Sequence, residues 1–200
     1  MAVPDYEGAQ HYALSRLEAE LPSHLTYHSL EHTRDQVLPA AERLANAQAI
    51  QDDALQLLRT AVCFHDLGFI EEVVDHESNS IRIARQVLPG FGFQPFQVNL
   101  VDGMIQATRL PQTPLSFLEK ILCDADLDTL GHPEFLRHSL LLRLEWQALG
   151  RQTTDEEWYL IQLDFILSHN YFTAAAHELR DQGKINNVNM LRQLLVGFKQ

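Results

Sequence analysis

Cysteine is scarce in this chain of 200 residues, which contains only Cys63 and Cys123. Two thiols cannot build a disulfide framework, so their number favours a reducing compartment. No uncharged apolar run approaches the roughly 18 residues that a transmembrane helix needs. The first ten residues also lack the basic flank and apolar run of a signal peptide. We therefore expect a cytoplasmic protein that has no membrane partner.

Basic side chains are also few: 15 Lys and Arg stand against 27 Asp and Glu, and the formal net charge is −12. Such a field repels phosphate backbones, so broad nucleic-acid binding is not expected. The hydrophobic fraction of 46% and the charged fraction of 21% are typical of a folded globular protein. At this length the chain predicts a single domain.

Strand-like alternation of apolar and polar residues is absent, and helical spacing takes its place. Apolar residues recur three and four positions apart, for example at Ala41 and Leu44 and again at Leu58 and Ala61. We expect an all-α protein with about seven to nine helices packed in a compact bundle. The sequence further predicts loops at 67–77 and 181–185 and a last helix near 186–198.

Three segments carry histidine or aspartate at close spacing: YHSLEHT with His28 and His32, AVCFHDLGF with His65 and Asp66, and ILCDADLDTLG with Asp124, Asp126 and Asp128. On a helix His65 shares the apolar stripe of Leu58 and Ala61, and Asp66 lies at its edge. Asp126 likewise flanks an apolar stripe, whereas Asp124 points further from it. A carboxylate beside an apolar stripe is costly to desolvate unless a cation compensates it.

These three segments can deliver their side chains to one interior point. Two imidazoles and two carboxylates form a mixed nitrogen and oxygen set that suits Mn²⁺, Fe, Co²⁺, Ni²⁺ or Zn²⁺. Four protein ligands leave positions open for water and substrate. The competing interpretation is that these are scattered polar residues whose side chains form hydrogen bonds with the backbone. For any one residue this interpretation is favoured over metal binding, but for the three segments together it is not.

The first segment leaves a geometric question open. On an ideal helix His28 and His32 lie opposite Val37 and Ala41, which carry the apolar face of that segment. Either this helix is covered on both sides, or the chain is not yet regular at His28.

The pattern H…HD…D, here His32, His65-Asp66 and Asp126, resembles the HD superfamily of metal-dependent phosphohydrolases. The segments YHSLEHT, HDLGF, HESNS and DADLDTLG are similar to its small stand-alone bacterial branch. The resemblance implies a single HD-type domain over residues 1–200. Its metal-site core would cover about 24–131, and C-terminal helices from about 132 to 200 would pack on that core.

The resemblance also implies roles for individual residues. His32, His65, Asp66 and Asp126 would bind the metal, and Asp66 would also take part in catalysis. Asp126 matches the family text A-D-x-L, but its leucine comes one place early as Leu127, so Asp124 remains the alternative ligand.

A further likeness concerns the leaving group. YHSLEH resembles the YHNxxH of cyclic-nucleotide phosphodiesterases, in which the first histidine, here His28, protonates the leaving oxygen. Ser29 stands where that motif has asparagine, which weakens the extension to cyclic nucleotides.

Substrate binding would involve His76 and Arg109, with His76 as a phosphate or second-metal contact and Arg109 as a bidentate phosphate ligand. The implied cofactor is a divalent ion, one of Mn, Fe, Ni, Co, Mg or Zn, with room for a second ion beside Asp66. The expected function is hydrolysis of a small phosphate ester, with a nucleotide favoured. Two alternatives stay open, an HD-type diiron oxygenase and a non-catalytic metal-binding or nucleotide-binding module; an oligomer is compatible with all three.

Overall fold

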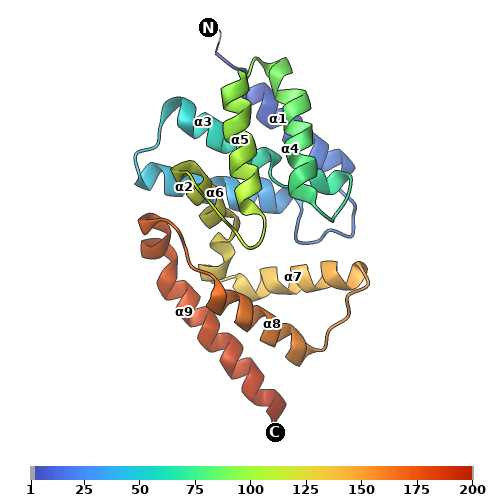
Figure 1. Ribbon diagram of the computed structural model, residues 1–200. Coiled ribbons are helices and arrows are strands. Elements are labelled where there is room, and N and C mark those ends of the chain that lie inside the picture. Colours follow the sequence, from blue (N-terminus) through green and yellow to red (C-terminus); the bar gives the residue numbers. More distant parts are fainter. Residues whose placement is uncertain (1–2, 200) are drawn as a thin grey trace. The chain divides into compact units, whose positions relative to one another are not determined.

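The computed structural model describes residues 3–199, and the prediction of an all-α protein is confirmed there (Figure 1). Nine α-helices and no strand occur in this part of the chain, in agreement with the expected seven to nine helices. The chain forms two compact units: the first runs up to Ser23 and continues over His28–Asp126, and the second comprises His24–Tyr27 and the chain from Leu127 onward. The prediction of one domain over 1–200 stays a prediction.

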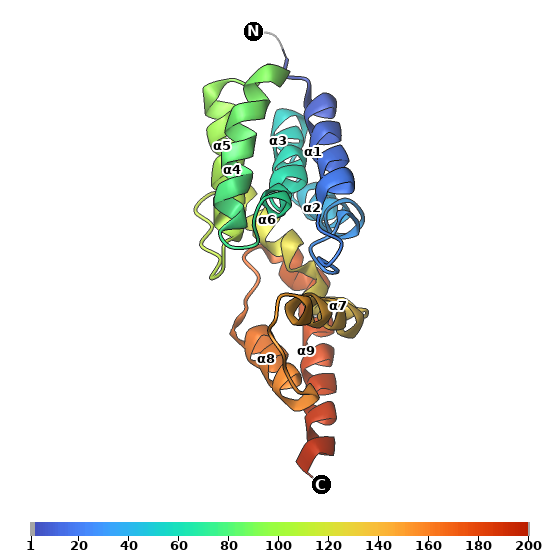
Figure 2. The ribbon, with the colours of Figure 1, turned by 90° about the vertical axis from the view of Figure 1, so that its right-hand side faces the viewer.

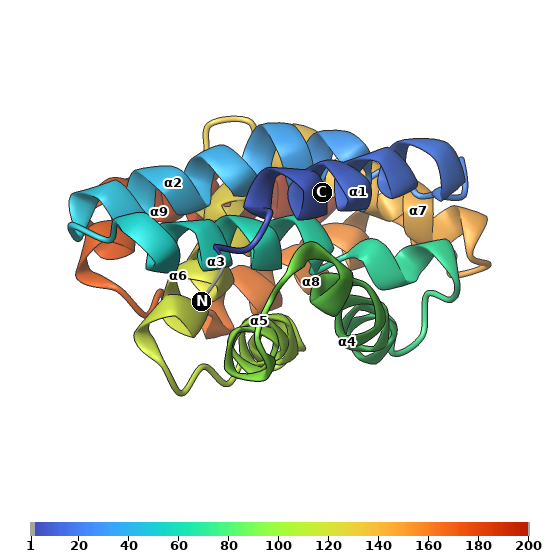
Figure 3. The same cartoon turned by 90° about the horizontal axis from the view of Figure 1, so that it is seen from above.

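The first unit is built around one central helix. Its helices are α1 (Tyr6–Glu20), α2 (Leu38–Ala47), α3 (Asp52–Phe64), α4 (His76–Val87), α5 (Pro95–Thr108) and α6 (Phe117–Asp126). Helix α3 packs against α1, α2 and α5, and Figure 3 shows it between the first two and the third. Its residues Leu58, Ala61 and Val62 are fully buried. The apolar stripe read from the sequence therefore forms the core, and α3 ends at the His65-Asp66 pair.

The second unit contains α7 (Phe135–Ala148), α8 (Asp155–Ser168) and α9 (Ala174–Val196). Helix α8 packs along α9, as Figure 2 shows, and the short 3₁₀ segment η4 (Asp128–Gly131) packs against α9 as well. Leu130, Phe135, Ile166 and Leu191 form the buried apolar cluster of this unit. The segment His24–Tyr27 joins it through Thr26, whose hydroxyl donates to the carbonyl of Leu141 at 2.7 Å.

The predicted loop at 181–185 is wrong, because α9 runs through it without a break. Gly183 lies within this stretch and serves a close contact: a Cβ placed there would lie 2.0 Å from the carbonyl oxygen of Gly131. The last helix accordingly begins at Ala174 rather than near 186. Thr173 starts it, because its hydroxyl accepts the N–H of Ala176 at 3.2 Å.

The predicted loop at 67–77 is partly ordered. It contains the 3₁₀ turn η2 (Leu67–Ile70), and α4 begins at His76. Among residues 3–199, no helix combines the length and the apolar character needed to cross a membrane.

Candidate metal centre

The segment that carries His28 and His32 departs from an ideal helix. The chain bends through His28, and residues His32–Val37 form a π-helical segment, η1, before α2 begins. The N–H of Leu38 donates to the carbonyl of Thr33, five residues back, which is the π pattern. Pro39 follows at once and has no N–H to offer. This answers the open question in favour of an irregular chain, because wider turns place His32 differently from an ideal helix.

His32 is buried, and both its backbone N–H and its imidazole ring contact neighbours on the same segment. Its backbone N–H donates to the Ser29 hydroxyl at 3.2 Å, and its Nδ1 lies 3.4 Å from Oε1 of Gln36. In the tautomer with the proton on Nδ1, the ring donates to this amide oxygen and the Nε2 lone pair is available to an ion. Sequence reasoning missed Gln36, whose signal is a polar residue four positions after a histidine ligand.

His65 follows the last residue of α3 and uses its ring in the same way. Its Nδ1 donates to the carbonyl of Val62 at 2.7 Å, so in the neutral ring the lone pair is on Nε2. That Nε2 atom is buried and has no hydrogen-bond partner among the described residues. The backbone of α3 thus fixes the tautomer that a metal ligand needs.

The turn after His65 is fastened to α4 by one buried serine. The Ser80 hydroxyl donates to the carbonyl of His65 and accepts the N–H of Gly68, both at 2.7 Å. At Gly68 a Cβ would lie 1.9 Å from the carbonyl oxygen of His76, so only glycine fits there. These contacts fix the position of the turn that carries Asp66 between α3 and α4.

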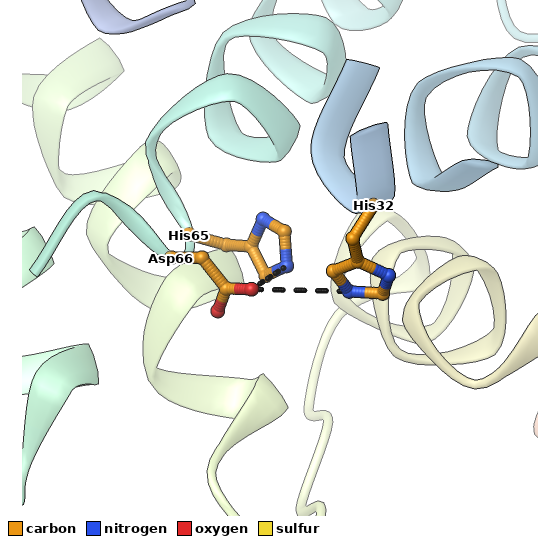
Figure 4. Close-up of side chains that lie close together, drawn as sticks. All are labelled: His32, His65 and Asp66. Atoms are coloured by element: carbon orange, nitrogen blue, oxygen red, sulfur yellow. Dashed lines mark ion pairs between the residues drawn. The ribbon is translucent and has the colours of Figure 1, made fainter. Parts of the chain in front are cut away.

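Four side chains from three segments meet at one point. Nε2 of His32 lies 3.8 Å from Oδ2 of Asp66 and 3.3 Å from Oδ1 of Asp126. Nε2 of His65 lies 3.3 Å and 3.4 Å from the same two oxygens. Figure 4 shows both imidazoles turned toward the Asp66 carboxylate. One ligand atom each from His32, His65 and Asp66 lies within 4.8 Å of the others, and Asp126 joins them through the two imidazoles.

The charges of this cluster depend on one another. Burial by itself would raise the pKa of Asp66, but the His65 imidazole overcomes it and holds that pKa far below its usual range. Burial also opposes the ionised form of Asp126, and the His32 and His65 imidazoles again lower its pKa. Burial works against a charge on His65, yet Asp66 and Asp126 raise the pKa of its ring. The site therefore keeps the Asp66 and Asp126 carboxylates ionised and attracts a cation.

These spacings fit a divalent metal ion. With bonds of about 2.1 Å, neighbouring ligand atoms lie about 3.0 Å apart in octahedral and about 3.4 Å apart in tetrahedral coordination. The measured separations of 3.3 to 3.8 Å are close to these values. The buried Nε2 of His65 and Oδ2 of Asp66, which have no hydrogen-bond partner in the described chain, are the atoms such an ion would join.

Two more histidines stand beside the cluster. Nε2 of His76 lies 3.5 Å from Oδ1 of Asp66, the oxygen on the other side of that carboxylate. The rings of His76 and His28 both stack on Phe69, at centroid distances of 3.8 and 4.4 Å. His28 is 6.1 Å from both the His32 and the His76 ring centroids. The structure therefore brings His28 and His76 to the edge of the cluster.

Other candidate residues have different surroundings. Arg109 forms an ion pair with Asp75, the residue before His76, so it lies near α4 but is already engaged. Asp124 is fully buried, although the helical wheel turned it away from the apolar stripe. The Asp128 carboxylate accepts hydrogen bonds from Nε and Nη2 of Arg180, each at 2.7 Å, and so serves the packing of the second unit.

The diiron alternative requires further histidine ligands from later helices. His132, Glu134 and His138 do form a second group of possible ligands, within the second unit. However, Nδ1 of His132 accepts the backbone N–H of Glu134 at 3.2 Å. A neutral imidazole that accepts at Nδ1 carries its proton on Nε2, so this ring offers no free lone pair. The group does not resemble the first cluster.

Comparisons with known proteins find similar folds among solved structures. No protein-family model matches the sequence, and no curated protein matches it. Three solved structures share the fold. A predicted HD superfamily hydrolase from an uncultured Thermotogales bacterium matches over 98% of this chain and 94% of that one, with 22% identity and a TM-score of 0.63.

The other two structures match this chain over a similar share of its length. Bacillus subtilis YpgQ, solved in complex with ADP, matches over 94% of this chain and 92% of its own, with 20% identity and a TM-score of 0.66. A Lactobacillus plantarum protein matches over 97% and 96%, with 16% identity and a TM-score of 0.72. The resemblance that the motifs suggested is thus confirmed at the level of the fold: this chain is folded like a predicted HD superfamily hydrolase.

Proposed function

We propose that this protein is a metal-dependent phosphohydrolase that cleaves a small phosphate ester. The observation that carries the proposal is the convergence of His32, His65, Asp66 and Asp126, with both Nε2 atoms 3.3 to 3.8 Å from carboxylate oxygens. In this proposal the four side chains hold one divalent ion. Mn²⁺, Fe, Ni²⁺, Co²⁺, Mg²⁺ and Zn²⁺ all accept such donors.

When bound, a divalent ion lowers the pKa of water toward neutrality and polarises phosphoryl oxygens. The residues of the chain supply the rest. With the ion bound, Val62 and Gln36 would hold His65 and His32 in the tautomer that leaves Nε2 to the metal. His28, at the edge of the cluster, is placed to give a proton to the leaving oxygen. Phe69 fixes the plane of the His28 ring by stacking on it.

The proposal gives His76 one of two roles. Its Nε2 faces Oδ1 of Asp66, whereas Oδ2 of Asp66 faces His32 and His65. It can thus contact the substrate phosphate, or bind a second ion that Asp66 would bridge. Arg109 is the proposed cation for a phosphate that reaches the start of α4, at the expense of its pair with Asp75.

A nucleotide is the favoured substrate class. Supporting this choice, YpgQ, which has the same fold, was solved in complex with ADP. The proposal extends to nucleoside phosphates generally and does not select a base or a number of phosphates.

The test combines elemental analysis of the purified protein with release of phosphate from a panel of nucleotides and other phosphoesters in Mn²⁺, Mg²⁺, Ni²⁺ or Co²⁺. We expect metal-dependent turnover in the wild type and none in Asp66→Ala. Asp35→Ala is the matched control, because Asp35 is exposed and pairs only with its neighbour Arg34. His28→Asn should keep the metal and lose about 10²- to 10⁴-fold in turnover. Absence of turnover across the panel in metal-loaded protein would refute the proposal.

A further inference from the structure

The second unit contains a cavity of about 350 Å³ beside the end of α8 and along one face of α9. Its apolar floor includes Ile166 and Val188, and Lys184 and Arg192 line it from α9. Positions 184, 188 and 192 are spaced by four residues, so they follow one face of that helix. The volume lies within the range of small-molecule sites, about 300 to 1,000 Å³.

Lys184 is half-buried and makes its hydrogen bonds with His169. Its Nζ donates to the backbone oxygen of His169, and it also lies 3.3 Å from Nδ1 of that residue. Across residues 3–199 no carboxylate forms an ion pair with Lys184. Burial lowers the pKa of this lysine, and the Asp181 carboxylate offsets only part of that effect.

Arg192 adds a second cation to the same cavity. It is exposed, and it too forms no ion pair within the described chain. In a protein whose acids outnumber its bases by 27 to 15, two such cations on one cavity are unusual. Asp181 also lines the cavity, but its carboxylate accepts from Nδ1 of His177 at 2.9 Å.

His169 carries no charge here. Its Nδ1 accepts from Lys184, so the ring proton is on Nε2. Burial, together with Lys184, lowers the pKa of His169 to about 4, so the ring is neutral near pH 7. Along α9 the order is therefore an acid at Asp181, a cation at Lys184, an apolar residue at Val188 and a cation at Arg192.

We propose that this cavity binds a small amphipathic anion, with its phosphate or carboxylate group between Lys184 and Arg192 and its apolar body over Ile166 and Val188. Asp181 repels the anionic group, which places it on the Arg192 side of Lys184. None of these residues belongs to the candidate metal centre. The proposal is therefore independent of the proposed phosphohydrolase activity.

The test follows backbone amide signals of the full ¹⁵N-labelled chain by NMR during titration with phenylphosphonate, benzoate and, as the neutral control, benzyl alcohol. The carbon–phosphorus bond of phenylphosphonate resists phosphoester hydrolysis, so turnover at the metal centre cannot consume the probe. We expect saturable shifts at Ile185 and Asn189 with one or both anions and not with the alcohol. Benzoate against phenylphosphonate separates carboxylate from phosphate preference.

Variants assign the binding to the two cations. Lys184→Gln and Arg192→Gln should each weaken binding about tenfold, because each removes one charge-assisted contact. Arg137→Gln removes an exposed cation of the same unit that does not line the cavity, and should bind like the wild type. Arg192 is exposed, so its variant stays informative if Lys184→Gln fails to fold. The proposal is overturned if no saturable shift occurs below about 10 mM, a concentration that corresponds to a binding free energy under about 3 kcal/mol. Unchanged affinity in Arg192→Gln would also overturn it.

Discussion

At the scale of single residues, the orientation of two imidazole rings decides what the candidate metal centre can bind. His65 gives its Nδ1 proton to the carbonyl of Val62, and Nδ1 of His32 lies 3.4 Å from Oε1 of Gln36. Both rings turn Nε2 toward the Asp126 carboxylate. Metal binding at the site would therefore depend on residues outside the proposed ligand set.

The choice between Asp126 and Asp124 is testable at this scale. Oδ1 of Asp126 lies 3.3 and 3.4 Å from the two Nε2 atoms, which makes Asp126 the predicted ligand. We predict that Asp126→Asn weakens Mn²⁺ binding by at least about tenfold, a change worth about 1.4 kcal/mol. Asp124→Asn should leave it unchanged; calorimetric titration of both variants measures this. Weaker binding in Asp124→Asn alone would reverse the assignment.

A pH prediction follows from His169. The pKa of its ring in the folded protein is about 4, below the ordinary 6.5, because burial and Lys184 oppose the charged form. As the pH falls below 6.5 the unfolded chain takes up a proton that the folded chain refuses, so this residue lowers the free energy of unfolding until the pH reaches about 4. Above 6.5 it contributes no pH dependence.

Asn in place of His169 keeps an acceptor near the Nδ1 position and cannot titrate. The free energy of unfolding, measured with urea at pH 7.5 and 4.5, should therefore fall less in His169→Asn than in the wild type. An equal fall in both proteins would contradict the assignment.

At the scale of elements, amphipathic spacing predicted the helices that form the cores. The spacing of apolar residues is visible in the sequence, and it shows which face of a helix is buried. Leu58 and Ala61, read as a stripe, are fully buried in α3. The π-helical turn at His32 could not be read in the same way, since it depends on one backbone bond from Leu38 to Thr33. Gly183 lies inside α9 because it allows close packing on Gly131, and sequence alone does not distinguish such a glycine from one that ends a helix.

The same distinction holds for the site. The motif residues His32, His65, Asp66 and Asp126 do meet in the structure, while their roles as ligands stay predictions. Gln36 and Ser80 could not be predicted, because their contacts depend on how a turn and a neighbouring helix lie in space.

Ser80 supplies the element-scale prediction. Its hydroxyl joins α4 to the turn that carries Asp66, and Ser80→Ala leaves the buried N–H of Gly68 and carbonyl of His65 without that partner. We expect a loss of about 1 to 3 kcal/mol in the free energy of unfolding, together with weaker metal binding. Ser78→Ala, on the same helix but with no described contact to the turn, is the control. Equal stability in the two variants would show that the serine does not fasten the turn.

At the scale of the whole molecule, metal binding and folding are linked. The first unit keeps the Asp66 and Asp126 carboxylates ionised, and a cation bound there would stabilise the folded chain by mass action. An ion at 100 times its Kd should add about 2.7 kcal/mol to the free energy of unfolding. Thermal unfolding followed by circular dichroism should therefore show a Tm that rises with Mn²⁺ and falls again after chelation. The same Mn²⁺ series on Asp66→Ala should give a flat Tm; a rise as large as in the wild type would place the ion elsewhere.

The central claim is that one divalent ion is shared by His32, His65, Asp66 and Asp126. Anomalous X-ray diffraction from crystals grown with Mn²⁺ tests it most directly. The account predicts an anomalous peak about 2.0 to 2.3 Å from Nε2 of both histidines and from an oxygen of each carboxylate. A fully loaded crystal with its peak on other residues, or with none at these four side chains, would contradict it.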